Sequence, residues 1–197
     1  MTDAIADIGS EMRVLEALRR RRMHRFFDGS QLDEETLKTL AWAATRAPTG
    51  GNQASRFVVV VTDPGLIQTV IDVTPSYIGT PPSAFFVVAT DLALAESQMG
   101  TDGRDHLSRI DAGAATENIA LAAVSLGLGC YMFTSSTTAV AAILDIPSSG
   151  RVEWLAAVGR PAPQPSRAGR AAPQIVYLNR WGGEEWNVKR KKKQTSQ

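Results

Sequence analysis

A chain of 197 residues is long enough to bury one substantial hydrophobic core, and its composition is that of an ordinary globular protein. The formal net charge is only +1, so overall charge does not favour nucleic acid as a partner. One cysteine and two histidines exclude an internal disulfide and a cysteine-based zinc site, and no stretch is apolar enough to cross a membrane.

The first half of the chain alternates between helix and strand patterns. Residues 11–22 show helical spacing of apolar residues, and residues 33–46 do so after Asp33, a good capping residue. The β-branched run 57–61 predicts a strand buried on both faces, closed by an Asp-Pro-Gly turn. A second strand of this kind is expected at 85–88.

The second half centres on a long helix over 105–126, which is apolar nearly all round toward its end and should be central and buried. The other expected elements are, in order, a strand at 130–134, a helix at 137–144, a strand at 152–158, an extended proline-rich arm at 161–173 and a short apolar segment at 175–178. The pattern indicates α/β architecture. We expect one domain over 13–182, between a lead-in at 1–12 and a basic, disordered tail at 183–197.

Three segments carry groups suited to ligand binding. The arginine-dense stretch 19–25 could grip phosphate oxygens through guanidinium groups, although such a run also suits a solvated helix end. The loop 47–53, Ala-Pro-Thr-Gly-Gly-Asn-Gln, offers two glycines for close backbone approach and two amides that suit the edge of a flavin pyrimidine ring. The helical segment 113–118, Gly-Ala-Ala-Thr-Glu-Asn, suits close helix packing. No dinucleotide fingerprint, Walker loop or nucleophile elbow accompanies them.

The order and spacing of these segments resemble the nitroreductase family. That family typically shows Arg-x-Ser-x-Arg/Lys-x-Phe, then an Ala-Pro-Ser-x-x-Asn loop before a valine-rich strand, then Gly-Ala-Ala-x-x-Asn leading to Leu-Gly-Leu-Gly. The matching residues here are Arg20-x-Arg22-x-His24-x-Phe26, Ala47–Asn52, Gly113–Asn118, Leu126–Gly129, Leu144–Pro147 and Gly159–Pro161. The resemblance implies a central, mostly antiparallel sheet flanked by helices, with an extended C-terminal arm and an intertwined homodimer.

It also implies an FMN-dependent enzyme in which NAD(P)H gives hydride to the flavin and a nitroaromatic, quinone or similar small acceptor then takes the electrons. The protein would position the flavin and need no side-chain nucleophile. The flavin would lie between two subunits, and Trp181 would pack the arm onto the neighbouring subunit. No metal, nucleic acid or membrane partner is expected, and with no signal-peptide pattern we expect a cytoplasmic protein.

The implied site residues follow from the matches one by one. Arg20 matches the phosphate-binding arginine, Arg22 stands where serine is usual, and His24 where a second cation is usual. Met132, Phe133 and Thr134 fall where the family places backbone near the flavin ring, with Thr134 or Ser135 facing the N5 side. The full expected set is Arg20, Arg21, Arg22, His24, Thr49, Asn52, Gln53, Met132, Phe133, Thr134 and either Arg170 or Arg180. Ala54-Ser55 replaces the usual Pro-Trp, so we expect a wider, less aromatic entrance.

Three alternatives stay open on the sequence. One is a flavoenzyme of the same fold with other chemistry, such as a dehalogenase, a flavin destructase or a dehydrogenase, chosen by a lid at 74–82 and 92–108. Another is a module that binds flavin or deazaflavin without turnover. The third is a basic nucleic-acid binder that uses stretches 19–25 and 189–193, although no recognition motif accompanies that charge.

Overall fold

The structure is a computed structural model, and it describes residues 12–74, 77–134, 136–165, 174–186 and 188. The chain forms two compact units, residues 1–164 and residues 165–197. The first holds every named helix and strand. In the second, Tyr177 pairs with Glu185 across a short antiparallel turn, and the Trp186 amide donates to the Val176 carbonyl.

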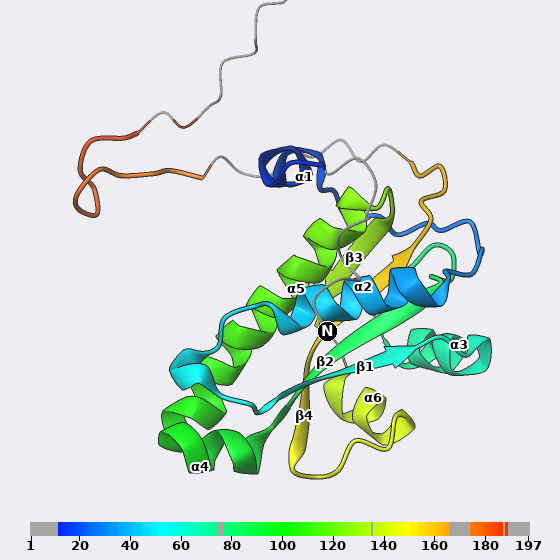
Figure 1. The fold of residues 1–197 in the computed structure, drawn as a ribbon, viewed down its shortest axis with the longest axis horizontal. Helices are drawn as coiled ribbons and strands as arrows, with labels where there is room; N and C mark the ends of the chain where they lie inside the picture. Colours follow the sequence, from blue (N-terminus) through cyan, green and yellow to red (C-terminus); the bar gives the residue numbers. More distant parts are fainter. Residues whose placement is uncertain (1–11, 75–76, 135, 166–173, 187, 189–197) are drawn as a thin grey trace, which may run out of the picture. The chain divides into compact units, whose positions relative to one another are not determined.

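One antiparallel sheet organises the first unit (Figure 1). Its strands are β1 (Arg56–Val61), β2 (Ala84–Asp91), β3 (Gly129–Phe133) and β4 (Gly150–Gly159), in the order β1-β2-β4-β3. Val59 pairs with Val87, Val87 with Leu155, and Cys130 with Val158. The chain after the first helix joins the β3 edge through a parallel bridge between Met23 and Cys130. The α/β class and the antiparallel sheet are confirmed.

The expectation that the 57–61 run is buried on both faces is wrong. β1 is an edge strand, in which Phe57 is 51% exposed and only Val61 is fully buried. β2, by contrast, is buried from Ala84 to Thr90 on both faces, as expected for 85–88. An unbroken valine run shows that a strand is apolar but does not say how many neighbours it will have.

In the part of the chain that the structure describes, six α-helices accompany the sheet: α1 (Val14–Arg20), α2 (Glu34–Thr45), α3 (Pro64–Val73), α4 (Leu92–Asp102), α5 (Ser108–Ser125) and α6 (Thr137–Ile143). Short turns of other helix types lie at Gly50–Asn52 (η1) and Gly103–Leu107 (η2). Asp33 caps α2 by accepting from the Thr36 amide, as its sequence position indicates.

Helix α3 was not expected, because Asp-Pro-Gly was interpreted as a turn. Asp63 instead accepts a hydrogen bond from the Leu66 amide as the helix N-cap, and Pro64 occupies the first helical position, where its missing N–H costs nothing. The same residues therefore close a strand and begin a helix. The segment 92–108, expected to form a lid, is α4 followed by η2, with a break at Met99 and Gly100.

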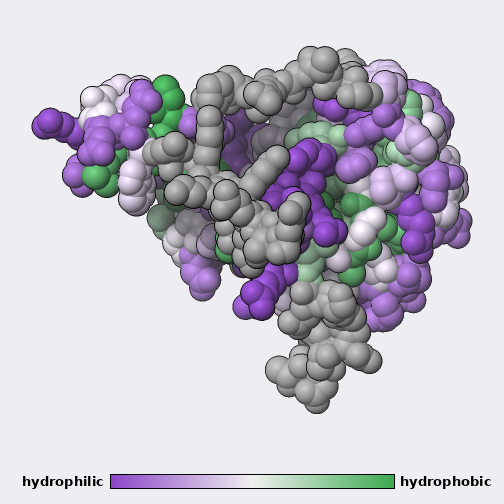
Figure 2. Space-filling view, turned by 90° about the horizontal axis from the view of Figure 1, so that it is seen from above, coloured by the Kyte–Doolittle hydropathy of each residue, from purple (hydrophilic) through white to green (hydrophobic). Residues whose placement is uncertain are grey.

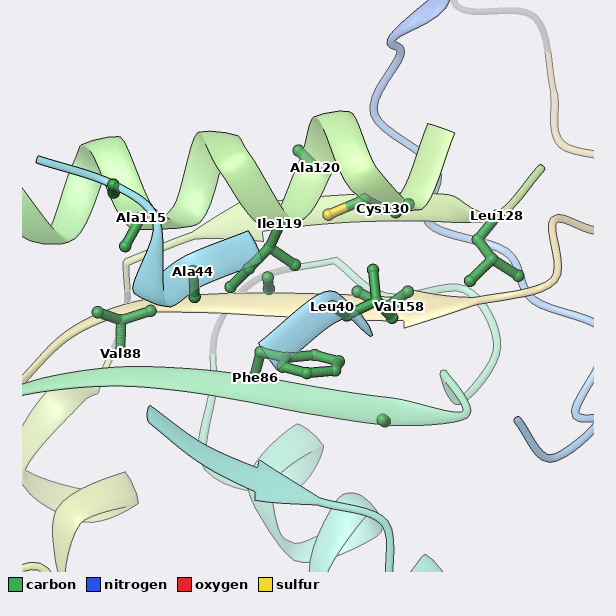
Figure 3. Packing of buried hydrophobic residues seen from close by; sticks show 14 of the residues in the cluster. Leu40, Ala44, Phe86, Val88, Ala115, Ile119, Ala120, Leu128, Cys130 and Val158 are labelled. Atoms are coloured by element: carbon green, nitrogen blue, oxygen red, sulfur yellow. The ribbon is translucent and has the colours of Figure 1, made fainter. Parts of the chain in front are cut away.

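The core has two parts, one on each face of the sheet. On one face, α2 and α5 pack Leu40 and Ile119 against Phe86, and the Cys130 side chain lies under α5 (Figure 3). On the other, Val70 of α3 and Val140 of α6 pack with Phe85. Each such fully buried large apolar side chain contributes about 1.5–3 kcal/mol to stability.

The α5 helix is central, but it is not buried all round. Its sheet-facing side is fully covered through Ala112, Ala115 and Ile119, whereas Leu121 is only half-buried and Ser125 is exposed. The outer side of α5 is also apolar, and one chain covers it only partly. That side is therefore available to pack against another surface.

Candidate functional site

The arginine-dense stretch begins at the last turn of α1, where charges are already paired within the chain. Arg20 Nε donates to Glu16 Oε1 at 2.6 Å, and Arg19 shares the same carboxylate. The hydrogen bonds from Arg19 and Arg20 lower the pKa of Glu16 from 4.5 to about 2. The Arg20 side chain is nevertheless 57% exposed. It therefore remains accessible to an anion.

The next two arginines are held differently. Arg21 pairs with Glu117 of α5 at 3.3 Å, which ties the end of α1 to the long helix. The Arg22 guanidinium donates to the backbone carbonyls of Arg19 and Arg21 at 2.9 and 2.7 Å. Arg22 thus satisfies carbonyls that α1 leaves free at its end, which is the structural role considered for this stretch. Seen from above, hydrophilic residues cover much of the visible surface, with smaller hydrophobic areas between them (Figure 2).

His24 lies beside the start of β3. Its backbone amide donates to the Cys130 carbonyl at 3.0 Å, and its Nδ1 lies 3.3 Å from the Arg22 carbonyl oxygen. A Cβ on Gly129 would come within 2.8 Å of the His24 Cβ, so only glycine permits this close approach.

Arg25 was not among the expected flavin-binding residues. It packs against Tyr131, which belongs to the part of the core formed with α3 and α6. Its guanidinium lies 4.2 Å from the centre of the Tyr131 ring, and its buried Nε finds no hydrogen-bond partner in the described part of the chain. The ring face of Tyr131 is the favourable surface for that cation.

The loop 47–53 presents its two amides in different ways. Asn52 is exposed and adopts a left-handed φ of 55°, a conformation that asparagine tolerates better than most residues. Gln53 is only 6% exposed, and its Oε1 accepts a 3.4 Å hydrogen bond from the Ser55 hydroxyl. Its Nε2 is buried and has no hydrogen-bond partner among the described residues. Thr49 is half-buried at the start of η1, and its carbonyl accepts from the Asn52 amide.

The two glycines of the loop have a different role from the one expected. A Cβ on Gly50 would meet Leu107 Cδ1 at 3.0 Å, and one on Gly51 would meet Met99 Sδ at 2.5 Å. The space in front of both glycines is therefore filled by side chains of η2 and α4, and close protein packing accounts for them. Gly51 also has a φ of 63°, which suits glycine.

Two residues that the sequence analysis did not single out hold this loop. Arg56, the first residue of β1, donates to the carbonyls of Ala44 and Ala47 at 3.2 and 3.1 Å. The buried Asp111 carboxylate of α5 accepts from the Gly50 amide with both oxygens, at 3.0 and 3.1 Å. The sequence signal was weak: each is a charged residue within a few positions of a matched motif, Arg56 after Asn52 and Asp111 before Gly113.

The remaining expected residues are spread more widely. Met132 is half-buried on the α5 side of β3, Phe133 is buried in the opposite core, and Thr134 is exposed. Arg180 is exposed in the second unit. Ser135 and Arg170 lie outside the described residues.

The structure gathers the expected residues into two groups along α5. The arginine stretch contacts Glu117, and the loop contacts Asp111, six residues earlier. At 1.5 Å per residue these contacts lie about 9 Å apart along the helix axis. Two cavities of about 330 and 480 Å³ flank the turn at Ile146–Gly150, and neither is lined by an expected site residue. Within the described residues, no cluster of three or more potential metal ligands occurs, and no helix is long and apolar enough to cross a membrane.

An antiparallel sheet with a long central helix, an arginine stretch and an amide loop is the architecture of nitroreductase-type oxidoreductases. The chain belongs to the nitroreductase family, whose sequence model matches residues 18–75 and 72–160. It is 26% identical over 179 residues to a Methanothermobacter thermautotrophicus protein provisionally named as an NADH dehydrogenase or NAD(P)H nitroreductase, and the match covers 87% of this chain and 90% of that protein.

Solved structures agree on the fold. A Parabacteroides distasonis protein with a provisional name of the same kind superposes with a TM-score of 0.72 at 22% identity, covering 87% of this chain and all of that one. An FMN-dependent nitroreductase from Clostridium difficile gives a TM-score of 0.71 at 18% identity, covering 85% of this chain and 99% of that one. The nitroreductase fold is therefore confirmed.

Proposed function

We propose that this chain is an FMN-dependent oxidoreductase that uses NAD(P)H to reduce a nitroaromatic, quinone or similar small acceptor, acting as a cytoplasmic homodimer. The observation that carries the proposal is the Gln53 amide, whose Nε2 is buried in the loop without an acceptor from the described protein. A buried donor without a partner is costly, and it is retained where a ligand supplies the missing acceptor. The pyrimidine edge of a flavin is rich in such acceptors.

The other expected residues have roles consistent with that placement. The exposed Asn52 amide can both donate and accept at the same flavin edge. Arg20 remains exposed enough to bind phosphate, and His24, whose ring lies near the Arg22 carbonyl, follows at the β3 edge. Arg21 is engaged by Glu117, so its contribution is positive charge near the phosphate rather than a direct contact. The family resemblance implies one further basic residue at the phosphate, for which Arg170 and Arg180 are the candidates in the sequence.

Bound FMN supplies hydride transfer between a reduced nicotinamide and the acceptor. The chain's own residues then bind, orient and shield the reacting groups. Gln53 and Asn52 would donate to the ring edge, and the backbone at 132–134 would line the ring. No protein nucleophile is required.

A homodimer is supported by the separation of the two groups along α5 and by the apolar surface that one chain leaves uncovered. Val14, Leu15 and Leu18 of α1 are 49–68% exposed, and the second side of α5 is half-buried. If two chains pack with their α5 helices antiparallel, the arginine stretch of one approaches the amide loop of the other. The arm beyond residue 160, with Trp181, would extend over the partner.

The visible spectrum of the purified protein tests the cofactor. Flavin absorption bands, with FMN released on denaturation, are expected, together with NAD(P)H oxidation when menadione or nitrofurazone is added. A colourless protein that FMN cannot reconstitute refutes the proposal. Tight FMN binding without turnover by NADH or NADPH would instead identify a flavin-binding module.

A further inference from the structure

Arg56 makes an unusual number of backbone contacts at one point of the fold. Its Nη2 donates to the carbonyls of Ala44 and Ala47, and its Nη1 to those of Asp111 and Pro48, at distances from 3.1 to 3.4 Å. Ala44 lies in the last turn of α2, where carbonyls lack partners within the helix and carry partial negative charge. One side chain thus joins the end of α2, the beginning of the amide loop and α5.

Asp111 holds the same loop from the other side. Its carboxylate is buried and receives the Gly50 amide on both oxygens. Gly50 begins η1, the short turn that ends at Asn52. Burial lowers the pKa of Arg56, and the nearby Asp111 charge opposes that shift, so Asp111 favours the charged form of the partly buried Arg56.

Both anchors act directly before the two ligand-facing amides. The loop is held at Ala47 and Pro48 by Arg56 and at Gly50 by Asp111. Asn52 then adopts its left-handed conformation. The Gln53 side chain follows, with its Nε2 buried and without an acceptor among the described residues. The left-handed backbone of Asn52 is not favoured locally, and the buried, unpaired amide of Gln53 is costly although its backbone is extended, so both depend on the loop being held from outside.

We propose that Arg56 and Asp111 are positioning residues that set the geometry of Asn52 and Gln53 toward the flavin without touching it. This inference rests on the proposed function, and it goes beyond it by assigning the control of flavin affinity and potential to two residues that lie outside the loop itself. Arg56 belongs to neither hydrophobic cluster of the described residues. Its described hydrogen bonds all go to backbone carbonyls at the loop and at the helices beside it.

The substitutions Arg56→Lys and Asp111→Asn test this in the FMN-loaded protein. Lysine keeps the charge but cannot spread planar donors over four carbonyls, and asparagine keeps the shape but loses the charge and one acceptor oxygen. We expect each variant to fold, with an FMN dissociation constant at least tenfold higher and a shifted flavin midpoint potential. Arg46→Lys and Asp102→Asn, exposed residues with no described side-chain contact to the loop, are the matched controls and should change neither.

Hydrogen exchange of the FMN-free protein provides a readout independent of the flavin. The peptide covering 47–55 should exchange at least tenfold faster in both variants, while peptides from β2 and β4 keep their rates. In an Asn52→Ala/Gln53→Ala background, Arg56→Lys should change the FMN dissociation constant less than twofold, because the groups it positions are gone.

The outcomes separate the two claims. If the unsubstituted protein binds no FMN, the proposed function and this inference both fall. If it binds FMN, but the variants show unchanged affinity, potential and loop exchange, only the positioning roles are refuted. A third outcome is a variant that loses stability while its folded fraction keeps the FMN affinity and the flavin potential of the parent protein. That result would assign Arg56 and Asp111 a purely structural role and would also refute the inference.

Discussion

Replacing Gln53 with methionine should have opposite effects on stability and on FMN binding. The Gln53 side chain is 6% exposed, its Nε2 has no acceptor, and its Oε1 accepts only one long hydrogen bond, at 3.4 Å, from Ser55. Methionine has a similar length and no polar hydrogen to satisfy. The substitution removes a buried unpaired donor while it keeps the loop filled.

The magnitude follows from these contacts. An unpaired buried amide costs about 1–3 kcal/mol, and the loss of the acceptor for the buried Ser55 hydroxyl costs about 1 kcal/mol in return. The FMN-free protein should therefore gain about 1 kcal/mol in its free energy of unfolding, or about 2–4 °C in Tm for a chain of this size. FMN affinity should fall about tenfold, which corresponds to about 1.4 kcal/mol, because the ring edge loses one donor.

Chemical denaturation of the apoprotein and quenching of FMN fluorescence on titration measure the two quantities. Asn118→Leu is the control, because the Asn118 amide is satisfied by the Ala43 carbonyl at 3.1 Å and its removal should destabilise the apoprotein. A Gln53→Met protein that is less stable than the parent, or that binds FMN with undiminished affinity, would show that Gln53 is a structural amide and not a ligand-facing donor.

Further outcomes concern the arginine stretch and the single cysteine. Arg20→Ala should weaken FMN binding far more than Arg19→Ala in the same titration; equal losses would return the stretch to a surface-charge role. Glu16 should titrate with a pKa of about 2 by NMR. The stability that its ion pairs add is then fully present above pH 4.5 and is lost as pH falls toward 2. An ordinary pKa for Glu16 would show that these pairs do not persist in solution. Burial raises the pKa of Cys130 to about 12, so the native protein should resist alkylation by iodoacetamide at pH 8 and react fully in denaturant, and rapid native labelling would contradict that burial.

Local patterns were sufficient for most of the secondary structure. Asp33 with two acidic residues after it predicted the start of α2, and the β-branched content of 57–61 and 85–88 predicted two strands. These features depend on backbone preferences and on caps within a few residues. The ordered motifs from Arg20 to Pro161 likewise predicted family membership, which the family match confirms.

Local patterns failed where the answer depended on neighbours in space. Whether a valine-rich strand lies at an edge or in the centre depends on which strands pair with it, so β1 was misjudged while β2 was predicted correctly. The glycines Gly50 and Gly51 were expected to admit a ligand, but the atoms facing them belong to Leu107 and Met99, about fifty residues later in the chain. No short window contains those partners.

The sequence by itself therefore determined the family and most of the element types, and it nominated the residues that we propose bind a flavin. Tertiary structure alone decided how those residues are held. Arg56 reaches carbonyls of α2, of the loop and of α5, and Asp111 receives an amide sixty-one residues away. The charged side chains that make these contacts can be read from the sequence. Their partners cannot, because they are backbone atoms, which any residue can supply. Only the folded chain specifies which carbonyls and amides come within reach.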